Sequence, residues 1–520
     1  MTALRLAAKS LVDSLRTALI SDALPGETES FDAAEQQKAA EFIADVALVR
    51  APGQIAIRVE STGGEAGKRR MRLAVVNDDM PFLVDSVAAA IAARGLAVHR
   101  LLHPIARVSR DPQGRLDALG EGKDESIIYI ELDREDARGR QELVADLKRV
   151  LDDVRAAVSD WRAMLAEMDS DAASLDQRDP ENAELVRWLR DNHFTLLGHA
   201  DLDAKGKMLK GLGILKNRFD PWDEAATKAA IEHLSDDRRN VLILKADRDS
   251  PVHRRVPLDV VIVQRPDCSL SVHIGLWTSA ALRSPASAVP VLRERLAKFD
   301  KELGFNPSSH GGKALMHAIS TLPHDLLISF DEYEVRKAAL TAMSLADRPR
   351  PTMLLLPGAL RRHLYAFVWL PRDEMTTSRR KAIALMLEGE VGAPVSSWSV
   401  ELGDGELALL RFTMPIDPTS KIPDVAALDA ALVEMVRGWA PAVEAELIAA
   451  VGPGRATRLS LTYLPEMPEG YRARTDPIDG AADILRICEL DDDHDRDARL
   501  YRSEHATANQ LHLKTYRLSG

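Results

Sequence analysis

One order of segments, strand–helix–strand–strand–helix, occurs twice in this chain and constrains its fold more than any other feature. In the first copy, strands are predicted at 72–77, 96–109 and 126–132, with one helix after Asp79 and a longer helix over 143–168. Both helices carry apolar residues at intervals of three and four, which is typical of helices with one buried face. This order begins a ferredoxin-like unit, an antiparallel sheet with helices on one face.

The second copy lies downstream. Strands are predicted at 363–370, 395–402 and 407–414, and helices at 377–388 and 425–439. The residue identities do not repeat, so only the order of elements is shared. We therefore predict the α+β class, as a multidomain chain of ferredoxin-like β-α-β-β-α units with helical linkers.

The length of 520 residues is too great for a single compact core. We expect an N-terminal helical segment (1–50), a first unit (51–168), a second, mixed α+β unit (182–345), a third unit with a helical extension (352–475), and an acidic linker that starts a further unit (476–520). The polar, acidic stretch 169–181 reads as a linker between the first two units. A strand-like run, 511–518, has no helix or strand after it, so we expect the natural protein to continue past Gly520.

Composition excludes several classes of protein. Apolar residues make up 46% and charged residues 28%, which is typical of globular proteins, and the net charge is −12. An acidic chain without a basic patch is a poor binder of nucleic acid or anionic membranes, and no apolar run is long enough to span a bilayer. Cys268 and Cys488, the only cysteines, lie far apart, which favours reduced thiols and a cytoplasmic protein.

Motifs for catalysis, cofactors or metals do not emerge. The chain has no Gly-x-Gly-x-x-Gly turn for a dinucleotide, and the phosphate-loop-like run 309–314 has Pro307 where its leading glycine would stand. His99 and His103 could meet a metal on one strand face, but without a nearby carboxylate we expect packed or surface histidines. The acidic run from Asp491 lacks the glycine and glutamate of a calcium loop. We therefore assign no catalytic, cofactor-binding or metal-binding residue.

The best candidate for binding is the turn between the first strand and the first helix. Asn77, Asp78 and Asp79 end the strand, and Ser86 follows in the helix. A helix start offers free N–H groups and the positive end of a dipole, which suit a carboxylate or another anion. We therefore predict Asn77, Asp78, Asp79 and Ser86 as effector-binding residues. In the alternative interpretation, the side chain of Asp79 is only a helix cap.

Several motifs, in order along nearly the whole chain, are similar to those of the large bacterial NAD-specific glutamate dehydrogenases. They are Asn77-Asp78-Asp79-Met80-Pro81 continuing to Val87, His193-Phe194-Thr195-Leu196-Leu197-Gly198, Gly275-Leu276-Trp277-Thr278-Ser279, Asn306-Pro307-Ser308-Ser309-His310-Gly311-Gly312, Leu370-Pro371-Arg372-Asp373, and Leu500-Tyr501-Arg502 with Leu511-His512-Leu513-Lys514-Thr515-Tyr516.

The resemblance implies the N-terminal region of such an enzyme, in which the units 51–168, 182–345 and 352–475 are ACT-like regulatory domains of the ferredoxin-like kind. It implies that the parent enzyme converts L-glutamate, NAD⁺ and water into 2-oxoglutarate, ammonia and NADH. The catalytic part and the NAD site would lie downstream, so this chain would hold no cofactor and catalyse nothing. The expected partners are further copies of the chain, the downstream catalytic region and an amino-acid effector.

One position departs from the amino-acid-binding ACT pattern. These domains usually carry glycine after the proline of the strand-to-helix turn, where a ligand approaches the backbone. Here the residue is Phe82, whose side chain could fill the effector site. A purely structural assembly segment without a small-molecule effector is therefore the alternative. An independent enzyme has the least support, because no nucleophile–base pair or metal cluster is evident.

Overall fold

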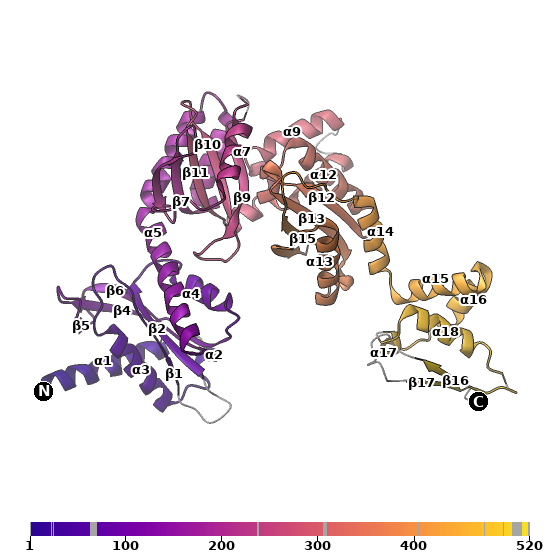
Figure 1. Ribbon diagram of the computed structural model, residues 1–520, viewed down its shortest axis with the longest axis horizontal. Helices are drawn as coiled ribbons and strands as arrows, with labels where there is room; N and C mark the ends of the chain where they lie inside the picture. The colour runs from indigo at the N-terminus through magenta and orange to yellow at the C-terminus, as the bar shows by residue number, and fades with distance from the viewer. Residues whose placement is uncertain are drawn as a thin grey trace.

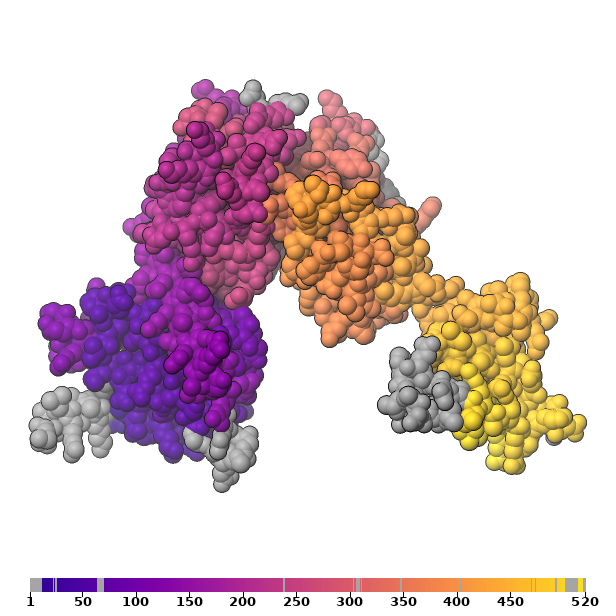
Figure 2. Space-filling model, viewed as in Figure 1, coloured from indigo at the N-terminus to yellow at the C-terminus, as the bar shows by residue number. Residues whose placement is uncertain are grey.

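The computed structural model describes residues 2–21, 23, 25–62, 70–236, 239–304, 309–402, 405–472, 474–491, 493–501 and 512–517. These residues form an arch, with the N-terminal unit at one foot and the C-terminal helices at the other (Figure 1). The two parts at the top touch broadly, whereas the C-terminal part joins its neighbour through a narrow connection (Figure 2). Within the described residues, no helix has both the length and the apolar character needed to cross a membrane.

The first unit packs helices on both faces of an antiparallel sheet. Its elements are α1 (Thr2–Ser21), α2 (Pro25–Thr28), α3 (Ala33–Ala47), β1 (Ala56–Ser61), β2 (Arg70–Asp78), α4 (Leu83–Ala92), β3 (Val98–Leu102), β4 (Ile105–Arg110), β5 (Leu116–Leu119), β6 (Lys123–Asp133) and α5 (Ala137–Leu175). The strands lie in the order β1-β2-β6-β4-β5, and β3 also pairs with β6. Alternate residues of β2 pack on α4 and α5, or on α3, so both faces of the sheet are covered.

Two predictions for this unit are corrected. The edge strand β1 was not predicted, because its side chains are only partly buried and give no clear apolar alternation. The single strand expected over 96–109 is two strands, β3 and β4, which both pair with β6. They are separated by His103 and Pro104, and proline has no N–H to continue a ladder.

The helix α5 is 39 residues long and belongs to two units. Its first half buries Leu143 and Leu147 against the first sheet, and its second half buries Met164 and Met168 in the core of the middle unit. The linker predicted over 169–181 is therefore wrong in its first half. The physical reason is that Asp171, which looks like a solvent residue in the sequence, is fully buried among partners from the middle sheet.

The middle unit contains a fully antiparallel sheet in the order β8-β7-β11-β10-β9. Its elements are α6 (Pro180–Trp188), the turn η1 (Leu189–His193), β7 (Phe194–Leu202), β8 (Met208–Gly213), α7 (Glu224–Leu234), β9 (Val241–Asp249), β10 (Pro257–Gln264) and β11 (Leu270–Trp277). The elements β8 and α7 were not predicted. The order β-β-α-β-β-β differs from that of the first unit, so the mixed α+β prediction is met, whereas an ACT-like element order is not.

Helices fill the space between the middle sheet and the next one (Figure 1). They are α8 (Ser279–Arg283), η2 (Ala286–Ala288), α9 (Leu292–Leu303), α10 (His310–Ser320), α11 (His324–Ser329) and α12 (Glu332–Asp347). Their apolar side chains share one core with residues of both sheets, among them Val261 from β10 and Phe367 from the third unit.

The third unit repeats the strand order of the first. It contains β12 (Thr352–Pro357), η3 (Ala359–Arg361), β13 (His363–Pro371), η4 (Arg372–Glu374), α13 (Thr377–Val391), β14 (Ser397–Glu401), β15 (Leu407–Pro415) and α14 (Val425–Val436), with the sheet order β12-β13-β15-β14. The predicted strand–helix–strand–strand–helix order is present in the third unit. In the first unit four strands, β3 to β6, lie between α4 and α5 instead of two, because the second predicted strand is divided and β5 was not predicted. In each unit, an additional edge strand, β1 or β12, precedes this order and pairs with its first strand.

The C-terminal part has its own small core, which includes Val443, Leu447 and Ile484. Its elements are α15 (Trp439–Val451), α16 (Pro453–Tyr463), α17 (Glu469–Arg472), α18 (Pro477–Ile487), β16 (Arg496–Tyr501) and β17 (His512–Arg517). The expected strand 511–518 pairs antiparallel with β16, whereas Leu511 and Leu518 lie outside the described residues. The whole chain is a mixture of helices and several antiparallel sheets, as the α+β prediction required.

Candidate functional site

The predicted binding turn joins β2 to α4, and two of its residues share one arginine. The Asp78 carboxylate accepts hydrogen bonds from Arg50 at 2.7 Å and from Arg155 at 2.6 Å. Arg155 also donates to Oδ1 of Asn77, whose side chain is buried. Burial opposes ionisation of Asp78, but the two guanidinium groups outweigh it and lower its pKa. Both residues are therefore engaged by groups of this chain.

Asp79 does not cap the helix, so that interpretation is wrong. The N-cap of α4 is Phe82, which makes no side-chain cap hydrogen bond and has φ of 72°. Met80, Pro81 and Phe82 separate Asp79 from the first helical turn, which removes its carboxylate from the free N–H groups. The left-handed backbone at Phe82 is the conformation that glycine adopts without strain, so a phenylalanine holds it only with support from its surroundings.

Support for this turn comes from the middle unit. The backbone N–H of His253 donates to Oγ of Ser86 at 2.9 Å, and its ring lies 2.9 Å from Asp85 and 5.2 Å from the ring of Phe82. Ser86 is buried as a result. A cavity of 430 Å³ beside the turn is lined by Pro81 and Phe82, and by none of the four predicted residues. The role of those four residues in effector binding stays a prediction.

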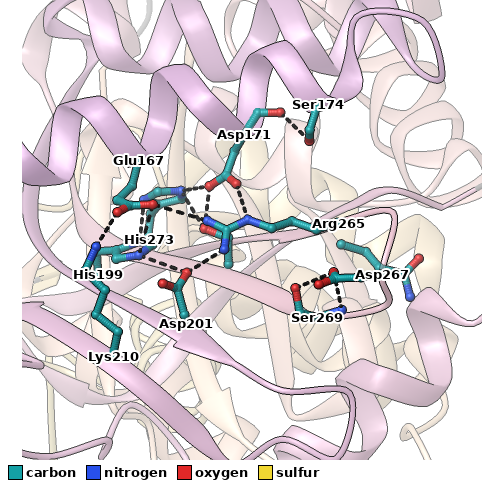
Figure 3. Close-up of polar contacts among 12 residues, drawn as sticks. Glu167, Asp171, Ser174, His199, Asp201, Lys210, Arg265, Asp267, Ser269 and His273 are labelled. Carbon is teal, nitrogen blue, oxygen red and sulfur yellow. Dashed lines mark hydrogen bonds and ion pairs between the residues drawn. The ribbon is translucent and has the colours of Figure 1, made fainter.

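A second group of polar side chains, which the sequence did not reveal, lies where α5 meets the middle sheet (Figure 3). We call it the buried polar cluster, and its members are Glu167, Asp171, His199, Asp201, Arg265, Ser271 and His273. Arg265 is central, because Nε donates to Asp171 at 2.7 Å and Nη1 to Asp201 at 2.8 Å. Asp171 also accepts from Ser271 and pairs with Nε2 of His273 at 2.8 Å.

The contacts within the cluster shift the pKa values of its members. Burial opposes ionisation of Asp171, but the hydrogen bond from His273 and the pairing with Arg265 outweigh it and lower its pKa. Burial likewise opposes ionisation of Asp201, yet His199 and Arg265 hold its pKa at about 2. Burial lowers the pKa of His273, which favours the neutral imidazole. The cluster therefore pairs the carboxylates of Asp171 and Asp201 directly with the Arg265 guanidinium, beside a His273 ring that burial keeps neutral.

Glu167, His199 and Asp201 offer ligand atoms within 4.8 Å of one another, close enough for a metal ion. The same carboxylates already face a cation, because Arg265 lies 3.3 Å from Glu167 and 2.8 Å from Asp201. A metal ion would have to displace this guanidinium, which is also held by buried Asp171. The donor set therefore fits a structural link between α5 and the sheet better than it fits a metal centre.

The remaining residues considered from the sequence have separate partners. His99 lies 2.8 Å from Asp133, and His103 lies 2.6 Å from Ser126, so the two histidines are packed individually. Ser309 of the phosphate-loop-like run caps α10, and Pro307, where its leading glycine would stand, is outside the described part of the chain. Asp491 accepts backbone hydrogen bonds from His494 and its neighbour in a tight turn.

Comparison with protein families matches four segments. The model described as "Glutamate dehydrogenase, ACT1 domain" matches residues 15–147, and the ACT2 domain model matches 353–440. Glutamate dehydrogenase helical motif 1 matches 289–348, and helical motif 2 matches 446–490. The two ACT matches fall on the two units that share a strand order, and the helical motifs fall on α9–α12 and on α15–α18. The middle sheet, β7 to β11, lies between the ACT1 match and the match to helical motif 1.

Curated relatives agree with these matches. The NAD-specific glutamate dehydrogenase of Pseudomonas aeruginosa is 28% identical over 478 residues, which is 85% of this chain and 29% of the relative. That of Halomonas elongata is 26% identical over 479 residues, 85% of this chain and 30% of the relative. The enzyme of the same name from Mycobacterium tuberculosis is 25% identical, with 85% and 29% covered. The chain thus spans about 30% of the length of these relatives. It resembles the NAD-specific glutamate dehydrogenase family over the region that carries ACT1, ACT2 and helical-motif segments.

Proposed function

We propose that this chain is a regulatory and assembly segment of an enzyme of the NAD-specific glutamate dehydrogenase type. The parent enzyme would oxidise L-glutamate to 2-oxoglutarate and ammonia and reduce NAD⁺, with substrate and NAD bound outside this chain. The observation that carries the proposal is that all four matched models are described as ACT domains or helical motifs. The chain itself would help to assemble and regulate the enzyme and would not catalyse its reaction.

The two matched ACT units would be ferredoxin-like. The strand order supports this. In the first unit β2 lies between β6 and the additional edge strand β1, and in the third unit β13 lies between β15 and the additional edge strand β12. Two helices cover one face of each sheet, α4 with α5 and α13 with α14. In both units the edge strand comes before the repeated order in the sequence, whereas a ferredoxin-like β-α-β-β-α-β unit places it last.

Self-association and contact with a downstream catalytic region belong to the same proposal. The edge strand β14 offers an unpaired strand edge, and Trp398 on it is half exposed with Arg380 stacked at 4.1 Å. Leu402, directly after β14, is 67% exposed. Exposed apolar side chains along an edge strand are typical of surfaces that pair with another chain. Both cysteines are free thiols, which accords with the proposed cytoplasmic location.

The alternative is an assembly segment that binds no small effector. One observation favours it for the predicted turn. The ring of Phe82 occupies the position after Pro81, and His253 of the middle unit covers Ser86, so protein groups already fill the turn. Under this alternative, substitutions at Asp78 or Asp79 would change stability and leave regulation unchanged.

The proposal is tested with the purified 520-residue chain, incubated with L-glutamate and NAD⁺ while NADH absorbance is followed. We expect no turnover. In parallel, light scattering should give a mass larger than the 57.2 kDa of one chain. NADH production that requires both L-glutamate and NAD⁺ would contradict the non-catalytic assignment, and a strictly monomeric chain would contradict the assembly role.

A further inference from the structure

A cavity of 460 Å³ lies between the middle sheet and the third unit, and none of the four predicted effector-binding residues lines it. Its walls come from β9, β10 and β11 on one side and from β13, β14 and β15 on the other, with the start of α11 closing one end. This volume is within the range of sites for small molecules, which is about 300–1,000 Å³. We call it the intersheet cavity.

Part of its charge is paired within the chain. Lys245 lies 2.5 Å from Asp259 and 3.1 Å from Asp325, and Arg411 lies 3.2 Å from Asp325. These four side chains are mostly buried, and together they carry two positive and two negative charges. They tie the middle sheet, α11 and the third sheet together, so the cavity has a rigid, electrically balanced floor.

Four other polar groups of the lining lack such partners. Within the described residues, the partly buried carboxylate of Glu401 has no salt bridge and no hydrogen bond, although the charge of Arg411 attracts it. Arg254 is an exposed residue without a salt bridge in the same part of the chain, and its guanidinium donates one hydrogen bond, to the backbone carbonyl of Trp277. Among the described residues, the Nε1 of Trp277 has no hydrogen-bond partner, although Trp277 is only 3% exposed. Neither ring nitrogen of His324, which is 4% exposed, has a hydrogen bond of good geometry in this part of the chain, and its one weak backbone contact is with Ile319. Polar atoms left without partners in a protein interior are costly, and native structures contain few of them.

We propose that the intersheet cavity binds a small zwitterion that carries an ammonium group and a carboxylate, such as a free α-amino acid. The ammonium group pairs with Glu401, and the carboxylate pairs with Arg254 and accepts from the Trp277 N–H. His324 donates to, or accepts from, a polar atom of the ligand.

The balance of charge decides the class of ligand. The lining holds the cations Lys245, Arg254 and Arg411 and the carboxylates Asp259, Asp325 and Glu401. A dicarboxylate or a polyamine would add two like charges to this balanced set, whereas a zwitterion leaves it balanced and satisfies one free group of each sign. Leu282 supplies apolar wall for a ligand side chain.

This inference names a site that is separate from the predicted turn, and it does not depend on the identity of the parent enzyme. Binding is measured on the chain itself, without glutamate oxidation as the readout. A failure to bind would therefore leave the proposed regulatory and assembly segment standing, and turnover by the chain would leave the binding result standing.

The test is thermal melting and calorimetric titration of the full chain with each standard L-amino acid in turn. We expect at least one to raise the melting temperature in a concentration-dependent way, because it binds only the folded state. Its N-acetyl derivative and its α-amide, which lack the ammonium group and the carboxylate respectively, should not. The variants Glu401→Gln and Arg254→Gln should each weaken binding by on the order of tenfold or more.

Matched controls are Arg255→Gln and Glu434→Gln, which neutralise exposed residues outside the cavity lining and should bind as the wild type does. The proposal is overturned if no amino acid binds, if the N-acetyl or amide form binds equally well, or if binding survives in both cavity variants. Loss of binding in Asp78→Asn with retention in Glu401→Gln would also overturn it, because the ligand would then lie at the predicted turn.

Discussion

The buried polar cluster and the intersheet cavity occupy the same face of the same sheet, yet they differ in how completely their groups are paired. His273 on β11 lies opposite Val261 on β10, and in the next row on that face Gly275 lies opposite Asp259, which lies opposite Lys245. Directly opposed residues share a face of the sheet. The cluster and the charged floor of the cavity are therefore neighbouring rows of one surface.

The elements that cover each row explain the difference. The helix α5 lies directly on the first row, and Asp171 reaches Arg265, Ser271 and His273 from it, so the row is closed by this chain. The second row faces another sheet across a cavity, where Glu401 forms no salt bridge and His324 no hydrogen bond of good geometry within the described residues. A buried charge that is paired within the chain, as Asp171 is with Arg265, indicates a structural role, although Nε2 of His199 in the same cluster has no hydrogen-bond partner within the described residues. Unpaired groups around an open volume indicate a ligand.

The largest effect that tests this contrast is expected at Asp171. The variant Asp171→Ala leaves Arg265 and His273 without their buried partner, which should lower the free energy of unfolding by about 3–5 kcal/mol. Urea unfolding followed by circular dichroism measures this change. The control Asp169→Ala removes a carboxylate that is 51% exposed and should stay within about 0.5 kcal/mol. If the two variants were equally stable, the cluster would not hold α5 to the sheet.

The two regions also predict how stability depends on pH. Burial lowers the pKa of both His273 and His324, so both are neutral in the folded chain. Below about pH 6.5 the unfolded state therefore binds more protons than the folded state, and the free energy of unfolding falls as the pH falls. The expected slope reaches about 1.4 kcal/mol per pH unit for each histidine.

Melting between about pH 7.5 and pH 5 measures this slope, and that of His324→Gln should be shallower. A slope that is unchanged in the variant would show that the cavity histidine does not titrate on unfolding.

A smaller effect separates the two strand-to-helix turns. In the third unit, Oγ of Thr376 accepts from the backbone N–H of Arg379 at 3.1 Å and caps α13, whereas Asp79 forms no cap on α4. Thr376→Ala should therefore cost about 1 kcal/mol, and Asp79→Ala less than about 0.5 kcal/mol. Chemical unfolding of both variants measures the two losses of unfolding free energy. A larger loss for Asp79→Ala than for Thr376→Ala would indicate that Asp79 caps α4 after all.

The smallest effect on stability is expected for Glu401→Gln. Burial raises the pKa of this carboxylate, and no hydrogen bond compensates it, so its charge destabilises the empty chain slightly at neutral pH. Replacement by glutamine should leave the free energy of unfolding unchanged or raise it by up to about 0.5 kcal/mol. A loss above about 1 kcal/mol would mean that Glu401 has a structural partner and resembles Asp171.

The sequence predicted those parts of the fold that periodicity controls. The helix α4, whose apolar residues recur at intervals of three and four, was predicted close to its observed position. The helix α13 was also predicted, although its apolar residues show little periodicity. The edge strands β1 and β12 were missed because neither was marked by a clear alternation of polar and apolar residues. A mostly buried strand such as β12 shows a short apolar run, which periodicity alone cannot distinguish from other buried segments.

Neither polar site could be predicted, because its members come from distant parts of the sequence. Asp171 lies in a stretch whose composition resembles a linker, and its partner Arg265 follows β10, 94 residues later. The intersheet cavity needs Arg254 and Glu401 on different units. A weak signal was available at Ser271 and His273, two polar residues spaced by two within an otherwise apolar strand, since such residues face the same side and need partners when buried.

The length of α5 has a mechanical consequence. A helix of 39 residues is a rod of roughly 60 Å, and its two halves are packed into different sheets without an interruption between them. The first unit and the middle sheet must then turn together, because a rod embedded at both ends transmits torque. At the opposite foot of the arch the chain changes direction at Arg437 and Gly438, between two separate cores. A rotation of the first unit would therefore be transmitted through α5 to the middle unit. A rotation of the C-terminal part would instead be absorbed at Arg437 and Gly438.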